Sequence, residues 1–281
     1  MIIEANKTIL ITGGNAGIGF ATAKYLVRQG QTVIIACRNK EKANAAIKAI
    51  EAEVEDADIS FRSLDLASLK NVRNFAQELL RDYQSIDVLI NNAGAMPSSK
   101  ILTEDGFEFQ FGVNYLGHFL LTHLLLPALD KAGSPRIVHV SSIMHLIGKI
   151  NPKSFKGGVK YSATKAYAQS KLANLMLSNE LASRLPIKIT SNAVHPGGVD
   201  SEIYRDLPIW LYRLIRPFLI SADRAGKYIG DMAISPDWES QSGRFKSAHG
   251  PLPVLPKSRS KADCKSLYQQ SCRLCNIQGL G

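Results

Sequence analysis

A tyrosine and a lysine four residues apart, Tyr167 and Lys171, form a pair suited to proton transfer. Both fall in a segment of helical length, and residues four apart lie on one face of a helix. There the ammonium would lower the pKa of the phenol, because a nearby positive charge favours the phenolate. Such a phenol can act as acid or base when a carbonyl and an alcohol interconvert. Alone the pair is weak evidence, since this spacing is common on exposed helices.

A second pair with the same spacing, Tyr161 and Lys165, precedes the first. The residues before it, 156–158, have loop character, so Tyr161 is expected at the start of the helix. Six residues turn a helix by about 600°, which would place the two tyrosines roughly 120° apart. Only one of Tyr161 and Tyr167 can therefore point to a shared site.

A glycine-rich segment, 12–19, reads T-G-G-N-A-G-I-G and directly follows a short apolar run. Its glycines permit a tight turn, and the helix that opens at Ile18 would point unpaired N–H groups at an anion. In this context the motif predicts a loop that binds the pyrophosphate of a dinucleotide. The expected binding residues are Gly13, Asn15, Gly17, Ile18 and Gly19. A turn that merely joins strand to helix is the alternative.

The second expected strand ends at Cys37 and Arg38, where an NAD-binding sheet usually carries an acidic residue for the ribose diol. A guanidinium at this point suits a 2′-phosphate, and no carboxylate is present to repel it. The sequence therefore predicts NADP(H) rather than NAD(H). A solvated charge at the strand end is the alternative interpretation of Arg38.

Short apolar runs alternate with segments of helical length along most of the chain. The expected strands are 8–11, 32–36, 59–64, 88–90, 137–140 and 188–194. The expected helices are 18–29, 40–51, 69–82, 106–130 and 161–184. This alternation predicts an α/β fold, a single Rossmann-like doubly wound parallel sheet with helices on both faces. We assign residues 1–250 to this domain, with an excursion near 201–236, and 251–281 to a basic tail with a short helix near 262–275.

The charge is concentrated at the C-terminus. The net charge is +10, and residues 244–281 hold seven Lys or Arg and one Asp, hence +6 of it. The basic residues there are not interleaved with aromatic ones, so the tail is expected to be solvated and nucleic-acid binding is not expected. Four cysteines are too few for a disulfide scaffold, and the C-x-x-C at Cys272 and Cys275 lacks further ligands for zinc, so free thiols are expected.

In this order and on these elements, the motifs resemble those of the short-chain dehydrogenase/reductase family. They are T-G-x-x-x-G-x-G, N-N-A-G at 91–94, Asn114, Ser142 and Y-x-x-x-K. The stretches "DGFEFQFGVNYLGHFLLTHLLL", "RIVHVSS", "SKLAN" and "VHPG" resemble the retinol dehydrogenase-like branch. "SKLAN" follows Tyr167 as in that branch, and the spacing to Pro196-Gly197 also fits Tyr167 better than Tyr161.

The resemblance implies a role for each matching residue. Tyr167 would donate or accept the proton, Lys171 would lower its pKa and bind the nicotinamide ribose, and Ser142 would hydrogen-bond the substrate oxygen. Asn114 would hold a water in the proton path to Lys171. The implied cofactor contacts are Asp65 at the adenine, Asn92 in the ribose region, and Val199 and Ser201 at the nicotinamide amide; Leu66 is a further expected cofactor-binding residue.

Two apolar segments are expected beside the carboxyl ends of the strands, where ligands bind in this fold. One is the loop with Met144, Leu146, Ile147 and Phe155; the other is 207–220. Their composition predicts a lipophilic aldehyde, ketone or alcohol as substrate. The second segment also carries two arginines and is a candidate for peripheral membrane contact, although packing on the domain is the commoner role of such a helix.

The resemblance implies a retinol dehydrogenase-like carbonyl reductase, with reduction favoured because cellular NADP is held largely reduced. It also allows a homodimer. A cytoplasmic location is expected, since no signal peptide or membrane-spanning segment is recognisable. The main alternative is a non-catalytic NADP(H)-binding sensor or scaffold on the same fold. The set of Asn114, Ser142, Tyr167 and Lys171 speaks against it, because a sensor needs only the glycine loop.

Overall fold

The computed structural model describes residues 6–198 and 220–281. Within these residues seven parallel strands form one sheet in the order β3-β2-β1-β4-β5-β6-β7. The strands are β1 (Thr8–Thr12), β2 (Thr32–Cys37), β3 (Ile59–Ser63), β4 (Val88–Asn91), β5 (Arg136–Val140), β6 (Thr190–His195) and β7 (Phe245–Ser247). The chain thus forms the doubly wound parallel sheet that the sequence predicts.

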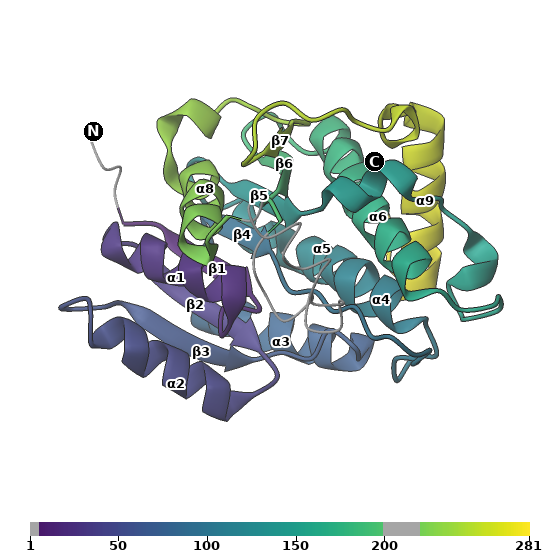
Figure 1. Cartoon of the computed structure of the whole chain (residues 1–281). Coiled ribbons are helices and arrows are strands. Elements are labelled where there is room, and N and C mark those ends of the chain that lie inside the picture. The colour runs from purple at the N-terminus through teal and green to yellow at the C-terminus, as the bar shows by residue number, and fades with distance from the viewer. Residues whose placement is uncertain (1–5, 199–219) are drawn as a thin grey trace.

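Helices follow most strands and cover both faces of the sheet (Figure 1). The longer ones are α1 (Gly17–Arg28), α2 (Lys40–Glu51), α3 (Leu69–Asp82), α5 (Gly117–Leu129), α6 (Ala163–Arg184), α8 (Ala222–Ile234) and α9 (Lys261–Cys275). The bounds of α2 and α3 are those predicted. Each is preceded by a capping side chain, Asn39 or Ser68, that accepts an N–H of the first turn.

The five inner strands are buried on both faces, whereas the edge strands β3 and β7 are only partly buried. Alternate residues of the inner strands pack into two separate hydrophobic clusters. On β1, Leu10 faces the layer formed by α3, α5, α6 and α9, whereas Ile9 and Ile11 face the layer formed by α1, α2 and α8. Figure 1 shows α1 and α8 side by side on one face, and α9 (yellow) beside α6. The short apolar strand runs in the sequence reflect this burial on both faces.

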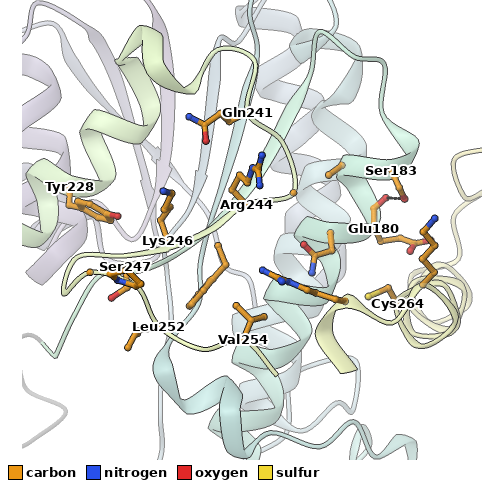
Figure 2. Close-up of a pocket in the computed structure, with 18 residues that line it drawn as sticks. Glu180, Ser183, Tyr228, Gln241, Arg244, Lys246, Ser247, Leu252, Val254 and Cys264 are labelled. Atoms are coloured by element: carbon orange, nitrogen blue, oxygen red, sulfur yellow. Dashed lines mark hydrogen bonds between the residues drawn. The ribbon is translucent and has the colours of Figure 1, made fainter. Parts of the chain in front are cut away.

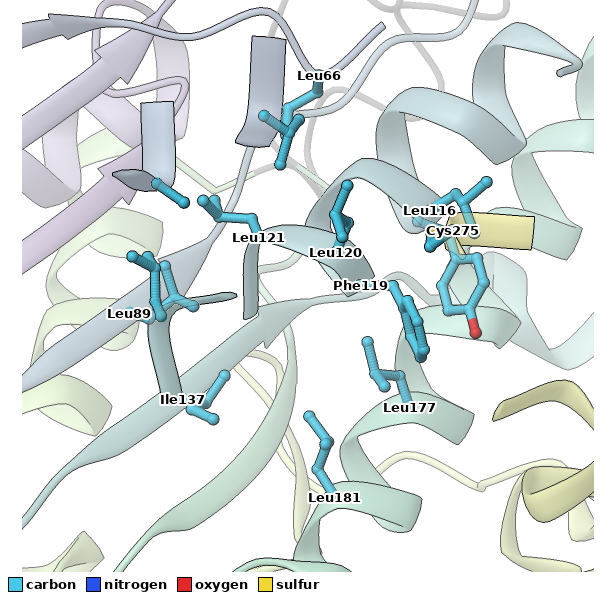
Figure 3. Close-up of a cluster of buried hydrophobic side chains, with 14 of the residues drawn as sticks. Leu66, Leu89, Leu116, Phe119, Leu120, Leu121, Ile137, Leu177, Leu181 and Cys275 are labelled. Carbon is cyan, nitrogen blue, oxygen red and sulfur yellow. The ribbon is translucent and has the colours of Figure 1, made fainter. Parts of the chain in front are cut away.

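Helix α5 is the centre of the first layer and is apolar around most of its circumference. Phe119, Leu120 and Leu121 are fully buried although they are consecutive, because sheet, α3 and α6 surround them. Figure 3 shows these side chains between Leu89 and Ile137 of the sheet and Leu177 of α6. A helix that is hydrophobic on all sides is expected only in such a position.

The single helix predicted for 106–130 is wrong at its N-terminal end. Gly106 lies in a turn that an antiparallel bridge between Leu102 and Glu108 closes, so the chain forms its first helical segment, the short α4 (Phe109–Phe111), only after this turn. A π-helical turn, Gly112–Leu116, follows, in which Gly117 donates its N–H to the carbonyl five residues earlier, at Gly112. This turn carries Asn114, and such turns are frequent at functional sites.

Smaller corrections concern element ends. The helix predicted from residue 161 starts at Ala163, because the Ser162 side chain accepts the Lys165 N–H and caps it. The edge strand β7 was not predicted. It has only three residues, of which one is half-buried, one exposed and one buried, so its sequence shows no apolar run.

The C-terminal segment is packed on the domain rather than forming a separate solvated tail. Helix α9 starts one residue before the predicted helix and contributes buried Leu267 and Tyr268 to the cluster around α5. The Arg184 guanidinium of α6 lies 4.5 Å from the centre of the Tyr268 ring, and the Tyr115 hydroxyl hydrogen-bonds Ser271. Only the opposite, basic face of α9 is exposed, as at Lys265.

We predict that the fold is acid-labile. Burial lowers the pKa of His118 to about 4, of His139 to about 3 and of His195 to about 4. In the unfolded chain these rings titrate near 6.5, so below that pH the unfolded chain binds more protons than the folded one. The free energy of unfolding should fall by up to about 1.4 kcal/mol per histidine per pH unit. A urea-unfolding midpoint that stays constant between pH 7.5 and 5 would contradict this.

Candidate active site

The glycine-rich loop between β1 and α1 has the geometry of a phosphate-binding turn. Gly13 adopts a φ of +70° and donates its N–H to the Ala36 carbonyl on β2, at 2.7 Å. Gly17, with a φ of +53°, starts α1. A Cβ added to Gly19 would lie 2.2 Å from the Gly13 carbonyl oxygen, so only glycine lets helix and loop approach this closely.

The N-terminus of α1 is open to an anion. Its N-cap is Ala16, whose side chain cannot accept the N–H groups of the first turn. Asn15 and Ile18 are half-buried and Gly17 is exposed beside them. Unpaired N–H groups and the positive end of the helix dipole favour a phosphate at this point. The residues present therefore fit the pyrophosphate of a dinucleotide.

A cluster beneath the loop, formed by Thr12, Asn92 and His118, holds it in place. The Thr12 hydroxyl accepts the N–H groups of Asn92 and Ala93 at 2.9 and 3.0 Å. It lies 2.8 Å from His118 Nε2, while His118 Nδ1 lies 3.0 Å from the Asn114 carbonyl. Because a carbonyl only accepts, His118 carries its proton on Nδ1 and the Thr12 hydroxyl donates to Nε2.

Asn92 supports the loop from below. Its amide donates to the carbonyl oxygens of Thr12 and Gly13 at 2.8 and 3.5 Å. Its contact with the cofactor ribose stays a prediction. The roles of Thr12 and His118 were not predicted, because only the packing of α5 against β1 brings them together.

Arg38 and Asp65 meet at the carboxyl ends of β2 and β3. The Arg38 side chain is 61% exposed, and its Nε lies 3.9 Å from Asp65 Oδ1. The same Asp65 oxygen accepts the Ala67 N–H and so holds the turn after β3. Leu66 is buried, and its side chain and carbonyl pack on Gly117 of α5. Of these, Arg38 has the freest access to a bound ligand.

Lys171 of α6 is buried, with 3% of its surface exposed. Its ammonium donates to the Val140 carbonyl at the end of β5, at 2.9 Å, and lies 5.5 Å from the centre of the Tyr167 ring. Burial lowers the pKa of Lys171 to about 8. A Cβ added to Gly94 would lie 3.5 Å from Lys171 Nζ and 3.6 Å from Asn114 Oδ1. Lys171 and Asn114 thus meet beside Gly94, just after β4, and the Tyr167 ring lies next to the same ammonium.

The side chain of Asn114 is held by the chain after β4. Its oxygen accepts the Ala95 N–H at 2.8 Å, and its amide donates to the Ala95 carbonyl and to Ser170 Oγ. These bonds place the π-helical turn directly against the N-N-A-G segment. The predicted water on Asn114 stays a prediction.

Ser142 lies just beyond β5 and is 9% exposed. Its hydroxyl accepts the Met144 N–H at 3.2 Å and so caps the 3₁₀ turn Ile143–Ile147. The neighbouring Ser141 donates to the carbonyl of Lys171, which ties the end of β5 to α6. Ser142 follows the end of β5 in the chain, and Lys171 is hydrogen-bonded to the same end of β5.

Tyr161 has a different surrounding. It precedes α6, and its hydroxyl donates to the Pro97 carbonyl at 2.7 Å and accepts from the Gln110 amide at 2.9 Å. Lys165 is exposed. Tyr161 therefore contributes to loop packing and Lys165 lies at the surface, whereas the ammonium of Lys171 is buried beside Tyr167.

The predicted substrate wall is only partly formed by the loop after β5. Met144 and Leu146 are half-buried, and Ile147 is 63% exposed. Phe155 does not belong to the wall: it is buried and stacks on Phe111 with ring centres 3.9 Å apart. Val199, Ser201 and most of 207–220 lie outside the described residues.

Within residues 6–198 and 220–281, no group of three or more His, Cys, Asp and Glu side chains could hold a metal ion. The four cysteines are free and buried. None of the described helices is long and apolar enough to cross a membrane.

Comparison with known proteins agrees with this geometry. The family model for the short chain dehydrogenases matches residues 7–211. Retinol dehydrogenase 12 of Mus musculus is 42% identical over 275 residues, which cover 97% of this chain and 87% of that protein. Retinol dehydrogenase 13 of Homo sapiens is 37% identical over 282 residues, covering 97% and 85%.

Solved structures share the fold. A protein from Mycobacterium Paratuberculosis superposes with a TM-score of 0.79 at 34% identity, covering 98% of this chain and 95% of its own. A short chain dehydrogenase from Shigella flexneri, complexed with NADP, superposes with a TM-score of 0.69 at 23% identity, covering 86% and 97%.

The chain therefore belongs to the short-chain dehydrogenase/reductase family, a family of oxidoreductases that use a nicotinamide cofactor. Within that family it is similar to the retinol dehydrogenases over nearly its whole length.

We predict that Gly19→Ala weakens binding of nicotinamide dinucleotides about 10-fold or more, because the new methyl group displaces the loop. Gly133→Ala is the matched control, since a Cβ there meets nothing within 4 Å. Calorimetric titration of both variants measures the effect, with circular dichroism to verify folding. An unchanged Kd for Gly19→Ala would show that the close approach is not needed.

Proposed function

We propose that the protein is an NADP(H)-dependent carbonyl reductase that interconverts a lipophilic aldehyde or ketone and its alcohol. The observation that carries this proposal is the buried Lys171 ammonium beside the Tyr167 ring, at the strand ends next to the glycine loop. A protein that only binds the dinucleotide has no need of a buried ammonium beside a phenol.

Tyr167 serves as the proton donor in the direction of reduction. The bound nicotinamide supplies the hydride. The Tyr167 hydroxyl gives its proton to the carbonyl oxygen as negative charge develops there, and the Ser142 hydroxyl donates a hydrogen bond to the same oxygen. Ser142 can do so because its contact with Met144 uses it as an acceptor and leaves its proton available.

Lys171 stabilises the phenolate that remains on Tyr167. Its ammonium holds one carbonyl, that of Val140, and lies within 5.5 Å of the ring in a site where little water screens the charge. Because its pKa is about 8, the ammonium can also pass a proton on at neutral pH. Asn114, fixed on Ala95 beside it, would position the water that returns this proton.

Arg38 provides the preference for NADP(H). Its guanidinium is largely exposed at the end of β2 and has one carboxylate, Asp65, at 3.9 Å. A 2′-phosphate on the adenine ribose would meet a planar fork of donors there, a geometry that favours bidentate hydrogen bonds. NADP(H) use in turn favours reduction as the direction in the cell.

A lipophilic substrate is supported by the side chains around Ser142. Ile143 and Ile147 are 42% and 63% exposed on the 3₁₀ turn that Ser142 caps, so apolar surface adjoins the reacting group. Burial of that surface against an apolar ligand would favour binding. The names of the relatives, retinol dehydrogenases, point to the same class of substrate.

The first test separates the two tyrosines. Tyr167→Phe should lower kcat for NADPH-dependent reduction by about 100-fold or more, because it removes the proton donor. Tyr161→Phe should keep most of the activity, because its hydroxyl binds Pro97 and Gln110. A screen of aliphatic, aromatic and isoprenoid aldehydes supplies the substrate. If Tyr167→Phe turned over like the wild type, the assignment would be wrong.

The second test concerns the cofactor. Arg38→Ala should raise KM for NADPH by roughly 10- to 100-fold, the value of a charge-assisted hydrogen bond to phosphate, and leave KM for NADH nearly unchanged. Initial rates with both cofactors measure this. Lys42→Ala, an exposed lysine nearby on α2, is the control for loss of one positive charge. An equal change for both cofactors would refute the role of Arg38.

A further inference from the structure

A cavity of about 1030 Å³ lies along the β7 edge of the sheet, between the C-terminal half of α6 and the segment leading into α9 (Figure 2). None of the residues assigned above to the cofactor or the reaction lines it. Its walls include Glu180 and Ser183 of α6, Gln241 before β7, and Leu252 and Val254 after it. The site is thus separate from the proposed active site, and the function proposed above does not account for it.

The cavity is strongly basic. Among the described residues that line it, the basic ones are Arg244, Lys246, Arg259 and Lys261. Glu180 is the only acidic residue among them, and its carboxylate is already bound by Arg184 at 2.7 Å, one helical turn further along α6. Glu180 therefore does not neutralise the four cations.

Among the described residues, none of the four cations has an acidic partner. Within the described part of the chain, Arg244, Arg259 and Lys261 make no side-chain hydrogen bond or ion pair. Lys246 contacts the Trp238 ring, with 5.9 Å between its ammonium and the ring centre. All four are exposed. Like charges gathered in one concavity repel one another and raise the local concentration of anions.

The four cations suit a phosphate group, which carries a charge of about −1.5 to −2 at neutral pH and so more than one carboxylate. Guanidinium groups bind phosphate through two parallel hydrogen bonds, and ammonium groups bind it as point charges. Ser183, Ser247, Gln241 and Tyr228 add neutral polar groups for the rest of a ligand. The volume of the cavity is near the upper end of the range for small-molecule sites, so it suits a compact ligand. Nucleic acid, in contrast, is bound by extended basic surfaces.

We propose that this β7–α9 cavity binds a ligand carrying one or more phosphate groups, held by Arg244, Lys246, Arg259 and Lys261. The phosphate belongs to a soluble organic phosphate or to the headgroup of a phospholipid. In either case the ligand occupies a site separate from that of the nicotinamide cofactor, because the lining residues are distinct.

The test uses the full chain saturated with the nicotinamide dinucleotide that binds more tightly, so that the cofactor site is filled. Inorganic pyrophosphate is titrated by calorimetry, and vesicles of phosphatidylcholine with and without phosphatidylinositol 4-phosphate are used for co-sedimentation. The charge-reversal variant Arg244→Glu/Lys261→Glu should bind the productive probe roughly 10- to 100-fold more weakly. Raising the salt concentration should weaken wild-type binding.

The matched control is Lys70→Glu/Lys131→Glu, which changes the net charge equally at two exposed lysines away from the cavity. Pyrophosphate binding lost only in the cavity variant supports a soluble ligand. Binding only to the phosphoinositide vesicles, lost in the same variant, supports a lipid headgroup. The proposal is overturned if neither probe binds, or if both variants bind like the wild type.

Discussion

The burial of one ammonium group, that of Lys171, is the constraint on which the site depends. A buried cation is unfavourable unless polar groups replace its water, and the Val140 carbonyl at the end of β5 does this. This bond and the bond from the Ser141 hydroxyl to the Lys171 carbonyl together hold α6 against the end of β5. Residual desolvation still lowers the pKa of Lys171 to about 8. The same packing brings the Tyr167 ring beside the charge.

The glycine loop and the residues around Lys171 are connected by a chain of hydrogen bonds. This chain runs through the layer formed by α3, α5, α6 and α9. Thr12 holds the segment after β4, donates to His118, and His118 donates to the carbonyl of Asn114. Asn114 in turn holds Ala95 beside the buried lysine. The glycine loop and the residues around Lys171 are thus fixed relative to each other. Preorganisation of this kind reduces the conformational entropy that is lost when cofactor and substrate bind.

Sequence reasoning recovered what depends on local spacing. The glycine loop, the bounds of α2 and α3 and the position of Lys171 on a helix follow from residue types at short range, so they were predictable. The π-helical turn at Asn114 was not, because its extra residue is set by contacts with Ala95 and Leu66. Phe155 was misassigned since an apolar residue in a loop gives no sign that it stacks on Phe111. The packing of α9 on the domain was not predicted, because the basic residues of its exposed face dominate its composition.

The most direct test is an NMR titration of the lysine side chains, labelled with ¹⁵N at Nζ, in the cofactor-free protein. One resonance should titrate near pH 8, against an ordinary value of 10.5, and should be missing from the Lys171→Met variant. Such a result would establish a desolvated ammonium beside Tyr167. If every lysine titrated above pH 10, Lys171 would be solvated, and its ammonium could not lower the pKa of Tyr167 in the way proposed.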